Sequence, residues 1–215
     1  MIRRLDLPDA AAAGASGLLH APSAARNLVP IRDALAPALP RRGTVLEIAS
    51  GTGQHVAALA VAHPELRWLP TEPDPLRRQT IDRRCAVLPN VAAARDLDAG
   101  RPGWAADGPW DAVMAVNLLH LVSDAEAAVM LDEAARGLVP GGLLALYGPF
   151  LRGGRATSAG DHAFHESLRA QDPAIGYKAV EMVEDVLGAL GLSVERREMP
   201  ANNLLILARM GAARL

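Results

Sequence analysis

The sequence is poor in cysteine, since Cys85 is the only one among 215 residues. A single thiol cannot form a disulfide within the chain, and it cannot provide the thiolates of a cysteine-based zinc site. Small secreted domains commonly rely on disulfides, so this scarcity predicts a protein of the reducing cytoplasm. No pairing of carboxylates with histidines along the chain predicts any other metal site.

Lysine is equally scarce: Lys178 is the only one, and the formal net charge is −2. Such a chain lacks the basic surplus of a protein that follows nucleic acid phosphates. It also lacks any stretch that approaches the roughly 20 apolar residues of a membrane span. Asp6, Pro8 and Asp9 interrupt the apolar residues near the start, which argues against a signal peptide. We therefore expect neither nucleic acid nor membrane as a partner.

What the chain does contain is a regular alternation of strand and helix patterns. The segments with the pattern of strands are 44–49, 66–71, 90–95, 110–117, 143–150, 192–199 and 203–210. Helical patterns occur at 23–39, 53–63, 75–87, 124–139 and 179–191. This alternation predicts an α/β fold, in which a Rossmann-like and mostly parallel sheet carries helices on both faces.

The two ends of the chain depart from this alternation. Residues 1–20 are rich in alanine and glycine and predict a flexible segment, which leaves 21–215 as a single domain. The last two strand patterns are separated only by Pro200, Ala201 and Asn202, a connection short enough for an antiparallel hairpin. The sheet is thus expected to have one reversed strand at its end. Residues 151–173 begin as a polar, glycine-containing loop and continue as a short helix, and this segment suits a lid.

The first strand leads into a glycine-rich turn, "VLEIASGTGQH" at 45–55. A dinucleotide site requires Gly-x-Gly-x-x-Gly, and Gly51 and Gly53 match its first two glycines. The third position is Val56, so the pattern fails there. Glu47 is a second objection, because a carboxylate at the strand end repels a pyrophosphate.

S-adenosylmethionine (SAM) fits this turn better than a dinucleotide does. It has no phosphate and carries a cationic sulfonium and a cationic ammonium, so Glu47 becomes favourable. Ala49, Gly51 and Gly53 leave room for the adenosyl-methionine chain. An acid should follow the second strand to bind the ribose hydroxyls, as in related nucleotide sites.

The required acids are present. Glu72, with Asp74 as a second candidate, follows the second strand pattern, and Asp96 and its neighbour Leu97 follow the third. The carboxyl ends of parallel strands meet at one edge of a sheet, so these residues are expected to converge on one crevice. Each acid alone is more simply a solvated loop residue. Their order along the chain favours a SAM site.

The motifs that carry a resemblance are "VLEIASGTGQH", "TEPDP", "NLLHL", "LVPGGLLALYGPF" and "MPANNLL". Together they resemble the class I SAM-dependent methyltransferases. More narrowly, the sequence resembles a methyltransferase-like family of unknown substrate, which also has a counterpart of "APSAARNLVPIR" at 21–32 and of the pattern from Tyr147 to Gly176. The resemblance covers about residues 20–210.

The resemblance implies a sheet of seven strands whose last strand is reversed. It also implies that the segment with Arg26 and Asn27 folds over the cofactor, where Arg26 is expected to bind the methionine carboxylate. One departure from the broad class is Ala49, since many methyltransferases have glycine there. The narrower family tolerates this residue.

Candidate residues for chemistry follow the fourth strand pattern. Asn117 is expected near the methionine end of the cofactor, and His120 is a candidate general base. The alternative for His120 is a residue that packs and caps the next helix. His55, just after the glycine turn, either contacts the cofactor or has a solvated or capping role.

Two candidates lie further along the chain. Tyr147, near the end of the fifth strand pattern, suits the wall of an acceptor pocket, although a core position explains it nearly as well. Asn202, in "MPANN", is expected to offer its amide to an acceptor. Its alternative is plain turn chemistry, because asparagine tolerates left-handed backbone.

Absent motifs narrow the reaction. No Asn/Asp-Pro-Pro-Tyr/Phe follows the fourth strand pattern, which disfavours methylation of nucleobase amino groups. Cys85 is expected in a helix far from the crevice, which argues against a cysteine nucleophile. What remains as acceptor is a small molecule or a protein side chain, and the small molecule is favoured. The sequence therefore predicts methyl transfer from SAM to an unidentified acceptor by a monomer or homodimer. Two alternatives remain open: a SAM-binding sensor or partner protein without methyl transfer, and an NAD-dependent oxidoreductase.

Overall fold

A computed structural model describes residues 5–8, 11–14 and 17–212 of the chain. They form two compact units: one spans Met1–Asp98 and Trp110–Ala115, and the other spans Ala99–Pro109 and Val116–Leu215. The segment predicted to be flexible, 1–20, lies partly outside the described residues. None of the helices in the described part is long and apolar enough to cross a bilayer.

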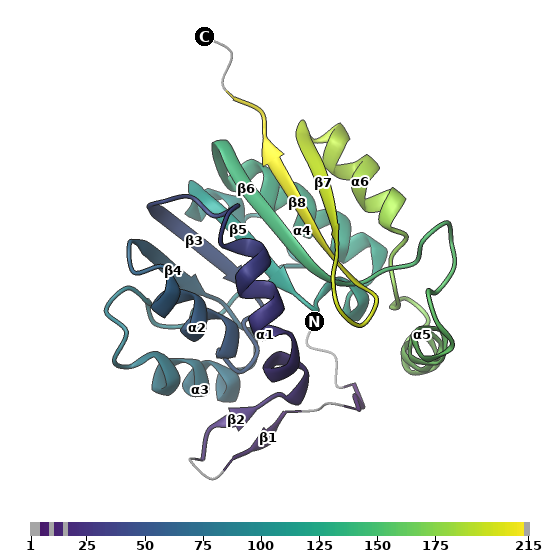
Figure 1. Ribbon diagram of the computed structural model, residues 1–215, viewed down its shortest axis with the longest axis horizontal. Helices are drawn as coiled ribbons and strands as arrows, with labels where there is room; N and C mark the ends of the chain where they lie inside the picture. Colours follow the sequence, from purple (N-terminus) through teal and green to yellow (C-terminus); the bar gives the residue numbers. More distant parts are fainter. Residues whose placement is uncertain (1–4, 9–10, 15–16, 213–215) are drawn as a thin grey trace. The chain divides into compact units, whose positions relative to one another are not determined.

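The first unit is built on a short parallel sheet. Its elements are β1 (Ala12–Ala13), β2 (Leu19–His20), α1 (Pro22–Leu35), β3 (Gly43–Ile48), α2 (Gln54–Ala62), β4 (Leu66–Pro70), α3 (Pro75–Cys85) and β5 (Trp110–Val116). β3 lies in the middle and pairs in parallel with β4 on one side and β5 on the other. β1 and β2 pair with each other as a separate antiparallel arm (Figure 1).

The composition of β3 explains its central place. Val45, Leu46 and Ile48 are each at most 1% exposed, and a run of apolar, branched residues is typical of a strand covered on both faces. Glu47 is the exception, because it is an acid in the same run and is only 2% exposed.

The strand predicted at 90–95 does not form, so among the described residues the main sheet has six strands and not seven. This segment follows β4 but makes only isolated parallel bridges, Trp68 to Val91 and Thr71 to Arg95. The Trp68 N–H donates to the Asn90 carbonyl. The next N–H of β4 that could donate to this segment would belong to residue 70, which is proline and has no N–H. The segment then gains one residue relative to β4 before Arg95 N–H reaches the Pro70 carbonyl, as in a β-bulge.

The second unit contains the reversed strand. Its elements are η1 (Trp104–Asp107), η2 (Leu119–Leu121), α4 (Asp124–Gly137), β6 (Leu138–Pro149), α5 (Ala159–Gln171), α6 (Val180–Ala189), β7 (Leu192–Glu198) and β8 (Asn203–Met210). The predicted antiparallel hairpin is confirmed, since β8 pairs antiparallel with β7. However, β8 lies between β6 and β7, so the reversed strand is not at the end of the row (Figure 1).

A capping box formed by Ser123 and Glu126 fixes the start of α4. The Ser123 hydroxyl accepts the Glu126 N–H at 3.2 Å, and the Glu126 carboxylate accepts the Ser123 N–H at 2.7 Å. This reciprocal capping box satisfies N–H groups that the first turn of a helix leaves without partners. The helix therefore begins directly after the turn that carries His120.

Asn90 yields a test of the first unit. Its Nδ2 lies 3.0–3.3 Å from the carbonyls of Ala60, His63 and Leu66 and so caps the end of α2. We expect Asn90→Ala to lower the free energy of unfolding by about 1–3 kcal/mol, because the buried carbonyls lose their donor. Asn90→Asp should be worse at neutral pH, since a carboxylate then faces three carbonyl oxygens. Urea unfolding measures both, and Arg67→Ala on the exposed side of β4 is the control. Equal stability of all three variants would contradict this role.

Candidate functional site

The turn after β3 depends on left-handed backbone. Ala49, Gly51 and Gly53 have φ values of 52°, 59° and 74°. A Cβ at Gly53 would lie 3.1 Å from Cγ1 and 3.2 Å from Cα of Ile81 in α3, so glycine is required there by both conformation and space. Ala49 adopts the same region despite its side chain, which places local strain at the turn.

Hydrogen bonds hold the ends of β3 and β4 together at this turn. Ser50 N–H donates to the Thr71 carbonyl at 2.7 Å, and Thr71 N–H donates to the Glu47 carbonyl at 2.9 Å. The Thr71 hydroxyl donates to the same Glu47 carbonyl at 2.8 Å. The backbone of Glu47 is therefore fixed, and so is the Cα from which its side chain extends.

The Glu47 side chain itself is buried with an unsatisfied atom. Its Oε2 has no hydrogen-bond partner among the described residues. Burial raises the pKa of Glu47 to about 8; a hydrogen bond from Ser50 partly offsets this, and the nearby Glu72 carboxylate adds to it. A buried carboxyl without a full set of donors is costly, so it marks a position for a cationic or hydrogen-bonding ligand.

Glu72 lies beside the turn, as the sequence predicts for a ribose-binding acid. One of its oxygens accepts the Gly51 N–H at 2.9 Å, and the other accepts the Asp74 N–H at 3.2 Å. Burial raises the pKa of Glu72, while the Asp74 N–H, the Arg77 charge and the Gly51 N–H lower it. The structure thus brings Glu47, Glu72 and the glycine turn together.

The other predicted acids are engaged differently. Asp74 is the N-cap of α3, where its Oδ1 accepts the N–H groups of Leu76 and Arg77. Asp96 has a largely exposed side chain and forms an ion pair with Arg78 at 3.4 Å. Leu97 beside it is half-buried. A ligand role for these three residues stays a prediction.

Residues at the start of the chain also reach the turn. His55 Nε2 and Asn27 Oδ1 are 2.8 Å apart, which joins two residues predicted to bind the cofactor. Burial lowers the pKa of His55 to about 4, so its imidazole is neutral at pH 7. Arg26, one residue before Asn27, is exposed.

Sequence reasoning missed two residues of this network, Gln54 and Arg84. Gln54 Oε1 accepts both the Ala21 N–H and the Thr52 hydroxyl at 2.7 Å. Arg84 donates to the Thr52 carbonyl at 2.8 Å and to the Leu19 carbonyl at 2.7 Å. Gln54 stands next to the glycine turn, which is a usable signal. Arg84 is one of several arginines in α3, and nothing in the sequence distinguishes it.

In the second unit, the predicted residues occupy two different settings. Asn117 has φ 53°, and its N–H donates to the Tyr147 carbonyl at 2.8 Å, so these two residues are adjacent. Tyr147 itself is buried in β6. His120 lies in η2 and is buried against the rings of Phe164 and Tyr177, whose centroids are 5.8 and 5.9 Å from its own.

The surroundings of His120 keep it neutral. Burial lowers its pKa to about 3, and the charge of Lys178 adds to this effect. Lys178, the only lysine, is itself buried and pairs with Asp124 at 2.9 Å while donating to the Val122 carbonyl at 2.8 Å. A neutral imidazole can accept a hydrogen bond, but in this environment it is a weak proton acceptor.

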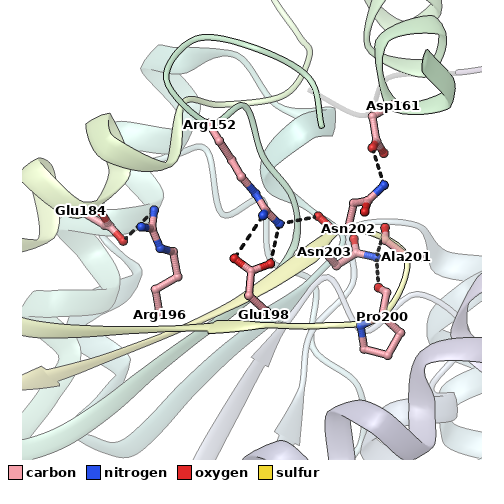
Figure 2. Close-up of polar contacts among 9 residues, drawn as sticks. All are labelled: Arg152, Asp161, Glu184, Arg196, Glu198, Pro200, Ala201, Asn202 and Asn203. Atoms are coloured by element: carbon pink, nitrogen blue, oxygen red, sulfur yellow. Dashed lines mark hydrogen bonds and ion pairs between the residues drawn. The ribbon is translucent and has the colours of Figure 1, made fainter. Parts of the chain in front are cut away.

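Asn202 is held by contacts within the unit (Figure 2). Its amide donates to Asp161 at 2.9 Å, and its carbonyl accepts from Arg152 at 3.1 Å. Arg152 also pairs with Glu198 at 2.9 Å. Ala201 and Asn202 both have left-handed backbone, so the turn chemistry considered for Asn202 is present. Its predicted contact with an acceptor stays a prediction.

The chain belongs to a known sequence family. A family model described as "Protein of unknown function (DUF938)" matches residues 19–209, which is nearly the whole chain. The description of this family names no activity.

Solved structures share its fold. An O-methyltransferase family protein from Burkholderia thailandensis matches with a TM-score of 0.75 and 21% identity over 89% of this chain and 58% of that one. Human N-acetylserotonin methyltransferase, solved with SAM, matches with a TM-score of 0.73 and 15% identity, over 88% of this chain and 53% of that one. An O-methyltransferase family 2 protein from Planctomyces limnophilus DSM 3776, solved with apigenin, matches with a TM-score of 0.71 and 18% identity, over 87% of this chain and 59% of that one.

These matches show that the chain has the fold of SAM-dependent methyltransferases. The chain spans little more than half the length of each of these structures. Their activities and ligands belong to those proteins.

The buried acid predicts how stability depends on pH. In the unfolded chain Glu47 has its ordinary pKa of 4.5, whereas in the folded protein the pKa is about 8. Between these values the folded protein holds a proton that the unfolded chain has lost. The contribution of this group is therefore complete below about pH 4.5 and is lost as the pH rises to about 8, by up to about 1.4 kcal/mol per pH unit.

We expect Glu47→Gln to remove this slope in the ligand-free protein. Urea unfolding near pH 5, 6.5 and 8 measures it, and Glu65→Gln, which changes an exposed acid before β4, should keep the slope of the unaltered protein. Parallel pH profiles for Glu47→Gln and the unaltered protein would show that Glu47 is ionised in the fold.

Proposed function

We propose that this protein is a methyltransferase that binds SAM in its first unit and transfers the methyl group to a small-molecule acceptor. The observation that carries the proposal is the buried Glu47 carboxyl, whose Oε2 has no partner among the described residues and which lies at the end of β3 beside the glycine turn. The shared fold supports the same reaction class.

The residues present fit this cofactor. When bound, SAM supplies an activated methyl group on a cationic sulfonium. Glu47 offers it a carboxylate, and a cation next to a buried acid favours the ionised form, which lowers the pKa of that acid. Glu72 is already oriented by the N–H groups of Gly51 and Asp74, and its remaining lone pairs accept ribose hydroxyls.

The same residues disfavour a nicotinamide dinucleotide. Val56 stands where the third glycine would permit close packing, and it is fully buried. A pyrophosphate at this turn would bring negative charge beside the buried Glu72 carboxyl, and it carries no cation to pair with Glu47. We therefore rank an NAD-dependent oxidoreductase below a methyltransferase.

His120, Tyr147 and Asn202 remain the candidates for acceptor contacts, and Asn117 remains a candidate for binding the cofactor. Two of the matched structures have names or ligands that refer to small molecules, N-acetylserotonin and apigenin, which favours an acceptor of that size. In this role His120 accepts a hydrogen bond from the acceptor through its neutral imidazole.

One observation favours a second candidate function, SAM binding without methyl transfer. His120 is buried against the rings of Phe164 and Tyr177, and this burial lowers its pKa to about 3, so the ligand-free protein offers only a weak base at that position. A sensor or partner protein needs the donor site of the first unit and no base at all.

The donor site is tested by calorimetry with SAM, S-adenosylhomocysteine and NAD. We expect the unaltered protein to bind the first two and not NAD. Glu72→Ala should weaken SAM binding at least about tenfold, which is about 1.4 kcal/mol, because the ribose loses its carboxylate. Glu65→Ala, at the opposite end of β4, is the control and should bind normally. Tight NAD binding without SAM binding would overturn the proposal.

Methyl transfer is tested with SAM that carries a labelled methyl group and a small-metabolite extract. We expect label to appear in a small molecule with the unaltered protein, and His120→Gln to reduce this transfer at least about tenfold while SAM affinity is kept. Binding of SAM without any labelled product would favour the sensor role.

A further inference from the structure

Arg84 joins two backbone segments that are far apart in the sequence. Its Nε donates to the carbonyl of Thr52, between the two glycines of the turn, and its Nη2 donates to the carbonyl of Leu19. We call residues 19–27, which include Leu19, the N-terminal strap. A single half-buried guanidinium thus connects the strap to the candidate donor site.

Gln54 makes a second connection between the same two segments. Its Oε1 accepts the Ala21 N–H of the strap and the Thr52 hydroxyl of the turn, both at 2.7 Å. Thr52 is therefore fixed from two directions, since Arg84 binds its carbonyl and Gln54 binds its hydroxyl. A third contact, between Asn27 and His55, joins the far end of the strap to the start of α2.

The helix that carries Arg84 is itself fixed to the turn. Ile81 lies against Gly53 so closely that a Cβ there would be 3.1 Å from its Cγ1. At the other end, Asp74 caps α3 and its N–H holds Glu72. The guanidinium of Arg84 is consequently presented at a defined position.

Arginine is well suited to this connection. Its planar guanidinium presents several N–H donors in fixed directions, so two carbonyls in different segments are bound at once. Lysine carries its three donors on one flexible point charge and does not reproduce this fork. Burial lowers the pKa of Arg84 from its usual high value, which indicates that the group is partly removed from water.

We propose that Arg84 is a positioning residue for the donor site: it orders the strap and the Gly51–Gly53 turn before SAM binds and thereby slows SAM release. The inference rests on the proposed function. Its physical basis is preorganisation, because segments that are already ordered lose less conformational freedom when the ligand binds. Arg84 acts through Thr52 and Leu19.

The test compares Arg84→Met with Arg83→Met, the exposed neighbouring arginine in α3. In ligand-free protein, hydrogen exchange at backbone amides of 19–27 and 51–55 should become faster in Arg84→Met, while β3 and β5 keep their protection. SAM should dissociate about tenfold faster from this variant, as followed by stopped-flow or surface plasmon resonance. Arg83→Met should match the unaltered protein in both measurements.

A second variant and a rescue experiment test the role of the guanidinium fork. Arg84→Lys retains the positive charge, so its amide exchange and SAM dissociation should lie between those of the unaltered protein and of Arg84→Met. Millimolar guanidinium ion should restore slow SAM dissociation to Arg84→Met. Normal exchange and normal SAM release in Arg84→Met would overturn the inference alone. Failure of the unaltered protein to bind SAM would overturn the proposed function, and with it this role.

Discussion

A carboxyl group buried at the end of a parallel strand is the constraint on which the first unit depends. Glu47 is 2% exposed, and its Oε2 has no partner among the described residues. An apolar residue in this place would have no charge to desolvate and would match the buried Val45, Leu46 and Ile48 of the same strand. The fold instead keeps the acid: burial raises its pKa to about 8, and its unpartnered Oε2 is available to a cationic or hydrogen-bonding ligand.

The turn beside this acid is held from several sides. Glu72 binds it from the end of β4, Ile81 and Arg84 contact it from α3, and Gln54 ties it to the start of the chain. In the second unit, Asn202 is engaged within the unit, where it donates to Asp161 and accepts from Arg152. The candidate SAM site thus has a carboxyl oxygen, Glu47 Oε2, that is open to a ligand. A methyl acceptor that binds Asn202 must instead compete with Asp161 and Arg152.

Most of the fold was predictable because hydrophobic period and turn residues are local properties. The hairpin around Pro200 and the glycine turn were found in this way. The segment 90–95 was wrongly predicted as a strand, since its pairing depends on the missing N–H of Pro70 in the neighbouring strand. At the candidate site, Glu47 and Glu72 were found from their places at strand ends, but Arg84 was not, because its partners are distant backbone carbonyls.

By itself, the sequence determined the alternation of strands and helices apart from 90–95, the glycine turn at Gly51 and Gly53, and the presence of acids at the end of β3 and after β4. These follow from periodicity and from backbone limits that each residue carries with it. Only the tertiary structure decided how those acids are used: Glu47 is buried with an open oxygen, Asp74 caps a helix, and Asp96 is exposed. Burial and hydrogen bonding decide the chemistry of a carboxyl group, and both depend on residues brought close by folding.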